Sequence, residues 1–264
     1  MDFVSHVNKT SHDRGTCLCI GIDPHQKKLD EIEGLDKRSM LLDFGRKIVD
    51  HTREFVCAYK INIAFFEVHG AKGIEQLIEL ISYIKKSGTP LILDCKRGDI
   101  GSTAEAYAKA CFEVYKADAV TLSPYMGWDS VKPFADYKGN FSFILALTSN
   151  EGANDFQLSG GLYRKVAKKV IEWDKENLGL VIGATKPGYL RKIRKSLGFN
   201  GLILVPGIGV QGGDLNKVME YGINNNGKGL IISISRSIIF ASMARKFYEA
   251  AAKKAFEYRA KMNI

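Results

Sequence analysis

The chain of 264 residues lacks any long hydrophobic run. Its longest apolar stretches, such as residues 202–205 and 230–234, have the length of strands and are far shorter than the ~20 residues of a membrane-spanning helix. Residues 1–6 (MDFVSH) have neither the basic start nor the apolar core of a secretory signal peptide. We therefore predict a cytosolic protein without a membrane segment.

Cysteine is scarce and histidine is dispersed. The five cysteines, an odd number, lie mostly in apolar segments, which indicates buried free thiols rather than a disulfide framework. Cys17 and Cys19 form C-x-C, not the C-x-x-C of zinc and redox sites, and no histidine has metal-ligand spacing. A P-loop and a dinucleotide fingerprint after the first predicted strand are also absent. These absences argue against a metal site and against enzymes that use either nucleotide motif.

The formal net charge of +9 is not concentrated in one segment. Lysine pairs at 27–28, 85–86, 168–169 and 253–254 are spread over predicted outer helices and loops. A basic RNA-binding or scaffold protein would instead carry a clustered lysine and arginine stripe with exposed aromatic residues. We therefore predict no nucleic-acid partner, although a positive field favours the approach of a small polyanion.

What the sequence does contain is an alternation of short apolar strands with amphipathic segments. Strands are predicted at 17–23, 56–62, 90–96, 118–123, 141–147, 179–184, 202–206 and 229–236. Helices are predicted at 37–53, 72–86, 103–116, 161–175, 187–197, 214–221 and 238–260. Eight strands without a linker-like break predict one domain over residues 1–264, an α/β fold of the closed (β/α)₈ TIM-barrel type.

Segment 91–100 (LILDCKRGDI) is a predicted buried strand that ends in charges of alternating sign. Residues two apart share a strand face, so Asp94 and Lys96 point the same way, and Asp99 follows in the turn. Burying ions costs several kcal/mol each unless their pairing is good, so such a cluster often has a functional role. The alternative is a salt-bridge or capping cluster at a strand end, with Thr103 as the N-cap of the next helix.

Lys60 and Asn62 form a similar pair on the preceding strand. In these barrels the chemistry lies at the C-terminal ends of the strands, where both pairs converge on one cavity. A lysine kept charged beside two carboxylates can stabilise negative charge and deliver a proton. Alternatively, Lys60 extends to solvent at the rim.

A glycine-rich segment, 205–213 (VPGIGVQGG), follows the seventh strand. Loops after strands seven and eight form the common phosphate site of this architecture, and strand eight supplies Ser235 and Arg236 there. These residues predict a phosphate site, whereas the alternative role for Arg236 is a surface ion pair with a helix carboxylate.

Together these motifs resemble the orotidine 5'-phosphate decarboxylase family. They are Asp23 in GIDP, Lys60-Ile-Asn62, D-x-K-x-x-D at 94–99 with Ile100 and Thr103, PGIGVQ, and Ser235-Arg236. The match runs in order from about residue 17 to about residue 240, and DCKRGDIGSTA is similar to the bacterial-type subgroup, also seen in some protists. The D-x-K-x-x-D part alone is shared with sugar-phosphate relatives.

The resemblance implies conversion of orotidine 5'-monophosphate to uridine 5'-monophosphate and carbon dioxide, the last step of de novo pyrimidine synthesis, without metal or organic cofactor. It implies that Lys96 stabilises the carbanion and protonates C6, that Asp94 lies against the substrate carboxylate, and that Lys60 organises the array. Asp99 and Thr103 would reach into the neighbouring subunit of a homodimer. The implied substrate-binding residues are Asp23 and Asn62 at the ribose, Thr148 or Ser149 at the pyrimidine edge, Pro206 at the pyrimidine end, and Gln211, Ser235 and Arg236 at the phosphate.

A rival enzyme class is a metal-dependent sugar-phosphate lyase or decarboxylase on the same barrel. Such an enzyme would need a carboxylate at position 60 to help hold magnesium, and this chain has a lysine there.

Overall fold

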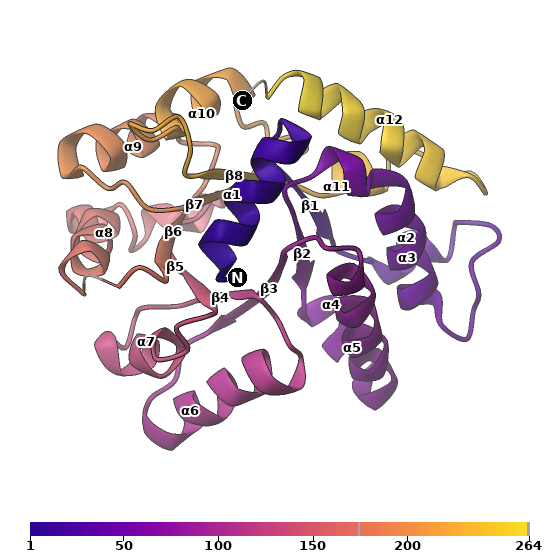
Figure 1. Cartoon of the computed structure of the whole chain (residues 1–264), viewed down its shortest axis with the longest axis horizontal. Helices are drawn as coiled ribbons and strands as arrows, with labels where there is room; N and C mark the ends of the chain where they lie inside the picture. Colours follow the sequence, from indigo (N-terminus) through magenta and orange to yellow (C-terminus); the bar gives the residue numbers. More distant parts are fainter. Residues whose placement is uncertain (174, 263–264) are drawn as a thin grey trace.

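A computed structural model, which describes residues 1–173 and 175–262, contains a closed barrel of parallel strands in chain order (Figure 1). Each strand pairs with the next, and β8 pairs with β1. The strands are β1 (Leu18–Ile22), β2 (Ala58–Asn62), β3 (Leu91–Arg97), β4 (Ala119–Leu122), β5 (Phe141–Leu147), β6 (Leu178–Ile182), β7 (Ile203–Pro206) and β8 (Leu230–Ile234). The predicted (β/α)₈ barrel is therefore confirmed.

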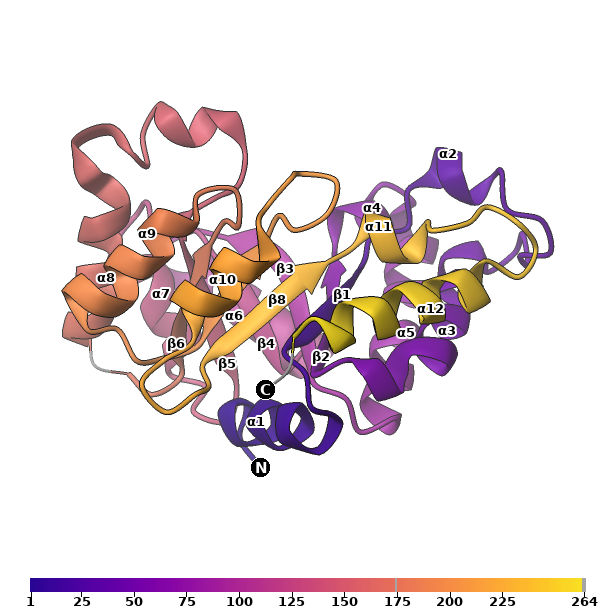
Figure 2. The ribbon, with the colours of Figure 1, turned by 90° about the horizontal axis from the view of Figure 1, so that it is seen from above.

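Most helices surround the barrel, and the long amphipathic ones bury an apolar stripe on the side that faces the strands (Figures 1 and 2). In α5, for example, Leu77, Leu80, Ile81 and Ile84 are buried at helical spacing. The helices are α1 (Phe3–Arg14), α2 (Gln26–Leu29), α3 (Met40–Thr52), α4 (Ala64–Glu67), α5 (Gly70–Lys86), α6 (Gly101–Lys109), α7 (Trp128–Ala135), α8 (Leu162–Trp173), α9 (Pro187–Arg191), α10 (Leu215–Gly222), α11 (Arg236–Ile239) and α12 (Phe247–Ala260).

Helix α1 lies across the N-terminal end of the barrel, below the strands in Figure 2. Its Phe3 ring lies 5.3 Å from the Phe141 ring and 5.9 Å from the Phe143 ring, and all three belong to the buried cluster inside the barrel. The sequence did not predict this helix, because it buries only a few residues of a mostly polar segment. Because α1 covers the N-terminal end of the barrel, we expect the active site at the C-terminal ends of the strands.

Several predicted helices differ in extent. Segment 238–260 is two helices, α11 and α12, separated by a turn in which Ser242 Oγ accepts a hydrogen bond from the Ala244 N–H. The helix α7 after β4 was not predicted. Helix α6 begins at Gly101, so Thr103 lies inside its first turn and the N-cap role considered for Thr103 is wrong. Within the predicted 161–175 helix, α8 ends at Trp173, and residue 174 lies outside the described residues.

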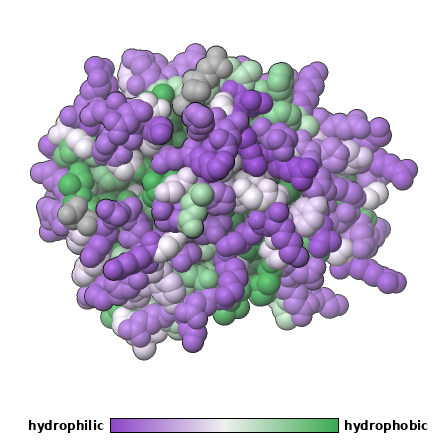
Figure 3. Space-filling model, viewed as in Figure 1, coloured by the Kyte–Doolittle hydropathy of each residue, from purple (hydrophilic) through white to green (hydrophobic). Residues whose placement is uncertain are grey.

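The face in Figure 3, which is the α1 side, is mostly hydrophilic, with apolar residues in separate small areas. In the part of the chain that the structure describes, we find no helix with both the length and the hydrophobicity needed to span a bilayer.

Candidate active site

Charged side chains of β2, β3 and the residue after β1 meet at the C-terminal end of the barrel. The Lys60 ammonium lies 3.1 Å from Oδ2 of Asp94 and 3.9 Å from Oδ1 of Asp23, and the Lys96 ammonium lies 2.6 Å from Oδ1 of Asp94. The register explains the convergence, because Lys60 and Asn62 share a face on β2 and Asn62 pairs with Asp94 on β3. The predicted alternation of lysine and carboxylate is thus present as a contiguous array.

Burial and pairing act in opposite directions on Lys60 and Asp94. The Lys60 side chain is only 8% exposed, and burial alone would lower its pKa, but the carboxylates of Asp94 and Asp23 raise the pKa above its usual value. Burial alone would raise the pKa of Asp94, yet Lys60 and Lys96 hold it well below its ordinary value. Both groups are therefore charged at neutral pH, and Lys60 does not extend to solvent.

Thr121 on β4 joins this array, although the sequence motifs did not mark it. Its hydroxyl donates to Oδ1 of Asp94 at 2.8 Å and accepts from the backbone N–H of Lys96 at 3.0 Å. A signal existed in the sequence, since Thr121 is the only polar residue of the buried strand AVTL. That pattern alone does not distinguish a site residue from a buried threonine with a local hydrogen bond.

The predicted phosphate region forms a hollow next to the array, with a volume of about 530 Å³ including space open to solvent. The Ser235 hydroxyl donates to Oδ2 of Asp23 at 2.6 Å and so ties β8 to β1. The predicted residues Asp23, Lys60, Pro206, Gln211, Ser235 and Arg236 all line the hollow, and Gly207, Ile208, Val210, Ser233 and Ser237, which were not predicted, complete it.

Two glycines allow the loop after β7 to fold over this hollow. Gly207 and Gly209 have φ angles of 108° and 89°, in a region that residues other than glycine rarely adopt. A Cβ on Gly209 would also lie 2.6 Å from the Ser237 hydroxyl oxygen. Arg236 is exposed at the edge of the hollow, and within the described residues it forms no ion pair. Its guanidinium is therefore available to an anion.

The contacts of Thr148 and Ser149 differ. The backbone N–H and the hydroxyl of Thr148 both bond to Oε1 of Gln157 within the loop after β5. The Ser149 hydroxyl instead donates to Oε1 of Gln211, a residue of the hollow, at 3.1 Å. Ser149 is thus the one of the two that is connected to the candidate site.

Within the described residues, the side chains of Asn62, Asp99 and Thr103 form no hydrogen bond or ion pair with the charged array. Asn62 Oδ1 accepts a hydrogen bond from the Ala64 N–H, and Asp99 Oδ1 accepts one from the adjacent Ile100 N–H. Thr103 is exposed on α6. Among the described residues, Asp99 has no basic partner within 4.0 Å. The structure therefore brings together most of the predicted residues, but leaves Asp99 and Thr103 outside the array of their own chain.

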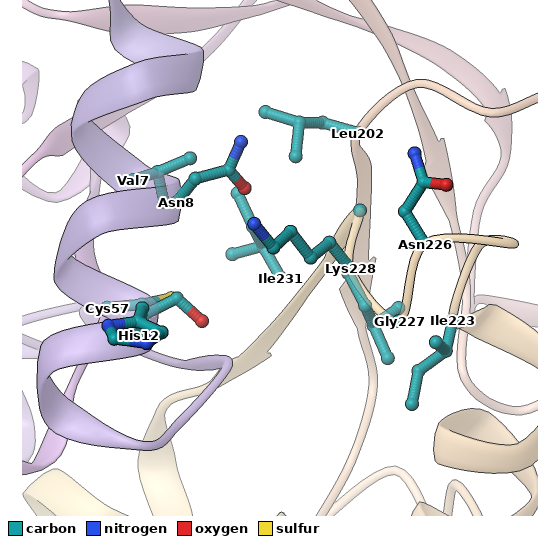
Figure 4. A pocket seen from close by; sticks show the side chains of 13 residues that line it. Val7, Asn8, His12, Cys57, Leu202, Ile223, Asn226, Gly227, Lys228 and Ile231 are labelled. Atoms are coloured by element: carbon teal, nitrogen blue, oxygen red, sulfur yellow. The ribbon is translucent and has the colours of Figure 1, made fainter. Parts of the chain in front are cut away.

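Figure 4 shows a second cavity, at the opposite end of the barrel. It lies between α1, which supplies Asn8 and His12, and the segment before β8, which supplies Asn226 and Lys228. None of the predicted site residues lines it. Because chemistry in this architecture lies at the C-terminal ends of the strands, the charged array is the candidate active site.

Cys17 and Cys19 do not form a shared site. Cys17 precedes β1 and Cys19 lies on it, the two belong to different buried clusters, and all five cysteines are free. Within residues 1–173 and 175–262, no group of three or more histidine, cysteine, aspartate or glutamate side chains is arranged to hold a metal ion.

Comparisons with known proteins agree on one family. Residues 16–251 match the model of the orotidine 5'-phosphate decarboxylase / HUMPS family. The chain is 41% identical over 275 residues to orotidine 5'-phosphate decarboxylase of Dehalococcoides mccartyi (strain CBDB1), covering 100% of this chain and 98% of that protein. It is also 41% identical over 271 residues to the enzyme of that name from Cupriavidus metallidurans, with the same coverage of both chains.

Solved structures give the same result. OMP decarboxylase of Leishmania donovani has a TM-score of 0.85 and 36% identity, covering 100% of this chain and 99% of that one. UMP synthase of Leishmania donovani has a TM-score of 0.87 and 37% identity, and the match covers 100% of this chain and 56% of that one. This chain thus spans little more than half of the length of that UMP synthase.

Proposed function

The chain belongs to the orotidine 5'-phosphate decarboxylase / HUMPS family, and on that basis we propose that the array of Lys60, Asp94 and Lys96 is its catalytic machinery. The reaction is the decarboxylation of orotidine 5'-monophosphate to uridine 5'-monophosphate and carbon dioxide, in pyrimidine synthesis. The main observation in support of this catalytic role is that Lys60 is buried between Asp23 and Asp94. A magnesium-dependent lyase would need a carboxylate at this position.

The chemistry follows from the charges. When the bond between C6 and the carboxyl carbon breaks, carbon dioxide leaves and an electron pair remains on C6. The Lys96 ammonium, held against Asp94, stabilises this localised anion and then transfers a proton to C6. The neutral amine of Lys96 regains its proton from water. Lys60 keeps Asp94 charged and fixed throughout.

Asp94 has a second role before the bond breaks. Its carboxylate lies against the carboxylate of the substrate, so that the two like charges repel each other and the repulsion is relieved when neutral carbon dioxide forms. Burial strengthens this effect because the local dielectric constant is lower than that of water. The three donors on Asp94 keep its charge in place while the substrate binds.

The hollow supports the proposed substrate contacts. A nucleotide phosphate would lie between Gln211, Ser235 and Arg236, with the ribose near Asp23 and Asn62. Pro206 would contact the pyrimidine end and Ser149 its edge, a choice over Thr148 that the Ser149–Gln211 hydrogen bond supports. Remote phosphate contacts of this kind supply binding energy that orders the loop after β7.

We also propose a cytosolic homodimer in which the whole chain is one catalytic domain. Five free cysteines support a reducing compartment. The position of Asp99 and Thr103 outside their own array supports a role in the site of a second copy.

The direct test is the loss of ultraviolet absorbance when the purified protein is mixed with orotidine 5'-monophosphate in metal-free buffer. We expect turnover by the wild type and none above background by Lys96→Ala. The surface variant Lys169→Ala, whose lysine pairs with Glu172 on α8, should match the wild type. Absence of turnover by folded wild-type protein would overturn the proposal.

A further inference from the structure

We propose that Thr121 is a positioning residue of this active site, which holds the carboxylate of Asp94 and the backbone of Lys96 in their working geometry. The inference rests on the proposed function and extends it to β4, a strand to which no motif assigned a role. Thr121 is 2% exposed and lies beside the array inside the barrel.

The need for such a residue arises from the pairing of β3 with β4. Leu93 pairs with Val120, but the next pair joins Arg97 to Leu122, so three residues of β3 lie opposite Thr121 alone. Within this irregularity Lys96 has a φ of 45°, in the left-handed region that residues other than glycine seldom adopt. The backbone at Lys96 therefore needs support from outside the strand ladder.

The Thr121 hydroxyl supplies that support. The Lys96 N–H donates to Oγ1 of Thr121 at 3.0 Å, in place of a backbone carbonyl of β4. The hydroxyl donates in turn to Oδ1 of Asp94 at 2.8 Å, and this direction is fixed because a carboxylate only accepts. One side chain thus bonds the backbone of the proposed proton donor and the carboxylate that faces the substrate.

Packing alone does not require a hydroxyl at this position. Valine has a similar shape and suits a buried strand as well as threonine does. A valine would nevertheless leave the Lys96 N–H without an acceptor. It would also leave Oδ1 of Asp94 held only by the Lys96 side chain, which is 48% exposed. The valine variant would keep all the charges of the array, but Asp94 and Lys96 would be held less firmly in position.

The test measures kcat and KM for orotidine 5'-monophosphate in Thr121→Val, Thr121→Ser and Thr121→Ala. Because small misplacements of reacting groups are costly, we expect kcat to fall about 10- to 100-fold in the valine variant, with KM changed less than about threefold. The serine variant, which keeps the hydroxyl, should stay within about threefold of the wild type. Ser142→Ala is the matched control and should leave kcat unchanged, because it removes from the neighbouring β5 a buried hydroxyl that has no hydrogen-bond partner among the described residues.

The outcomes separate the role of the hydroxyl from that of packing. A valine variant with wild-type kcat overturns the inference, as does equal impairment of the valine and serine variants. If the valine variant does not fold, the serine and alanine variants decide: activity retained only in serine supports the inference, and equal activity overturns it. If the wild type itself has no activity on the nucleotide, the proposed function fails instead.

Discussion

The Lys60 ammonium lies 3.1 Å from Oδ2 of Asp94, although the two residues are 34 positions apart in the chain. Both side chains are largely buried, so each charge depends on the other for its stability. The pair also receives Lys96 on the second Asp94 oxygen and Asp23 on the far side of Lys60. Removing one member therefore changes the electrostatics of all four.

Replacing Lys60 with methionine should remove the charge while keeping much of the side-chain volume. We expect kcat/KM to fall by about 100- to 1000-fold, comparable to the loss of one preorganised electrostatic group in other active sites. The free energy of unfolding should fall by about 3 kcal/mol, because Asp23 loses its basic partner and Asp94 loses one of two. Lys169→Met, at an exposed position on α8, is the control and should change neither quantity. Wild-type activity in Lys60→Met would contradict the proposed role.

The depressed pKa of Asp94 predicts how stability depends on pH. Below its ordinary pKa of 3.8, this carboxyl is protonated in the unfolded chain but still charged in the folded protein, so the unfolded state binds more protons. The stabilisation from charged Asp94 is therefore fully present above about pH 5 and lost as pH falls through the lower folded pKa. Urea titrations should show a difference between wild type and Asp94→Asn that is constant from about pH 5 to 8 and shrinks below about pH 4. A difference that persists unchanged at the lowest pH would contradict the pairing.

Much of this array was predictable because it depends on two regular features. Alternation along a strand places Asp94 and Lys96 on one face, and adjacent parallel strands bring Lys60 beside Asp94. Thr121 could not be predicted in this way, since its contacts depend on the irregular pairing of β3 with β4. The alternation of side chains along β4 does not show that three residues of β3 lie opposite Thr121.

The N-terminal helix shows a different limit. Helix α1 contacts the barrel through Phe3 and Val7, and the rings that receive Phe3 belong to β5, far away in the sequence. Local hydrophobic periodicity is weak in such a segment, because its stability comes from tertiary packing. The break between α11 and α12 is also hard to predict, because residues 240–246 contain neither proline nor glycine.

Arg236 offers a test of the phosphate region. If its guanidinium binds the phosphate dianion, Arg236→Ala should lose about 2 to 4 kcal/mol of transition-state stabilisation on the nucleotide. The slow reaction of the phosphate-free nucleoside should barely change, because that substrate makes no contact with residue 236. Measuring kcat/KM for both substrates distinguishes the roles, and equal losses would mean that Arg236 is structural.

Metal independence is a further prediction of the buried lysine at position 60. The activity of the purified enzyme should survive exhaustive treatment with EDTA followed by assay in metal-free buffer. The Lys60 ammonium occupies the place where a magnesium-binding carboxylate would be needed, so an added divalent cation should give no increase. Activity lost to EDTA and restored by magnesium alone would favour the sugar-phosphate class of enzymes.

The shared site of the proposed homodimer depends on the direction of the chain after β3. Asp94 and Lys96 are held in the strand, whereas Asp99 lies in the turn before α6, and within the described part of the chain its side chain bonds only to the adjacent backbone N–H. A turn that leads away from the array would carry Asp99 and Thr103 to a partner related by a two-fold axis. Each subunit would then complete the site of the other.

Two inactive variants test this arrangement by complementation. Lys96→Ala and Asp99→Ala should each be nearly inactive alone. In a mixed dimer one site combines both lesions, while the other has intact Lys96 from one chain and intact Asp99 from its partner. Random reassortment makes about half of the dimers mixed, so about a quarter of all sites should be native. After dissociation and reassociation, the mixture should therefore recover about a quarter of wild-type activity. If subunit exchange is verified and no activity returns, Asp99 acts within its own chain.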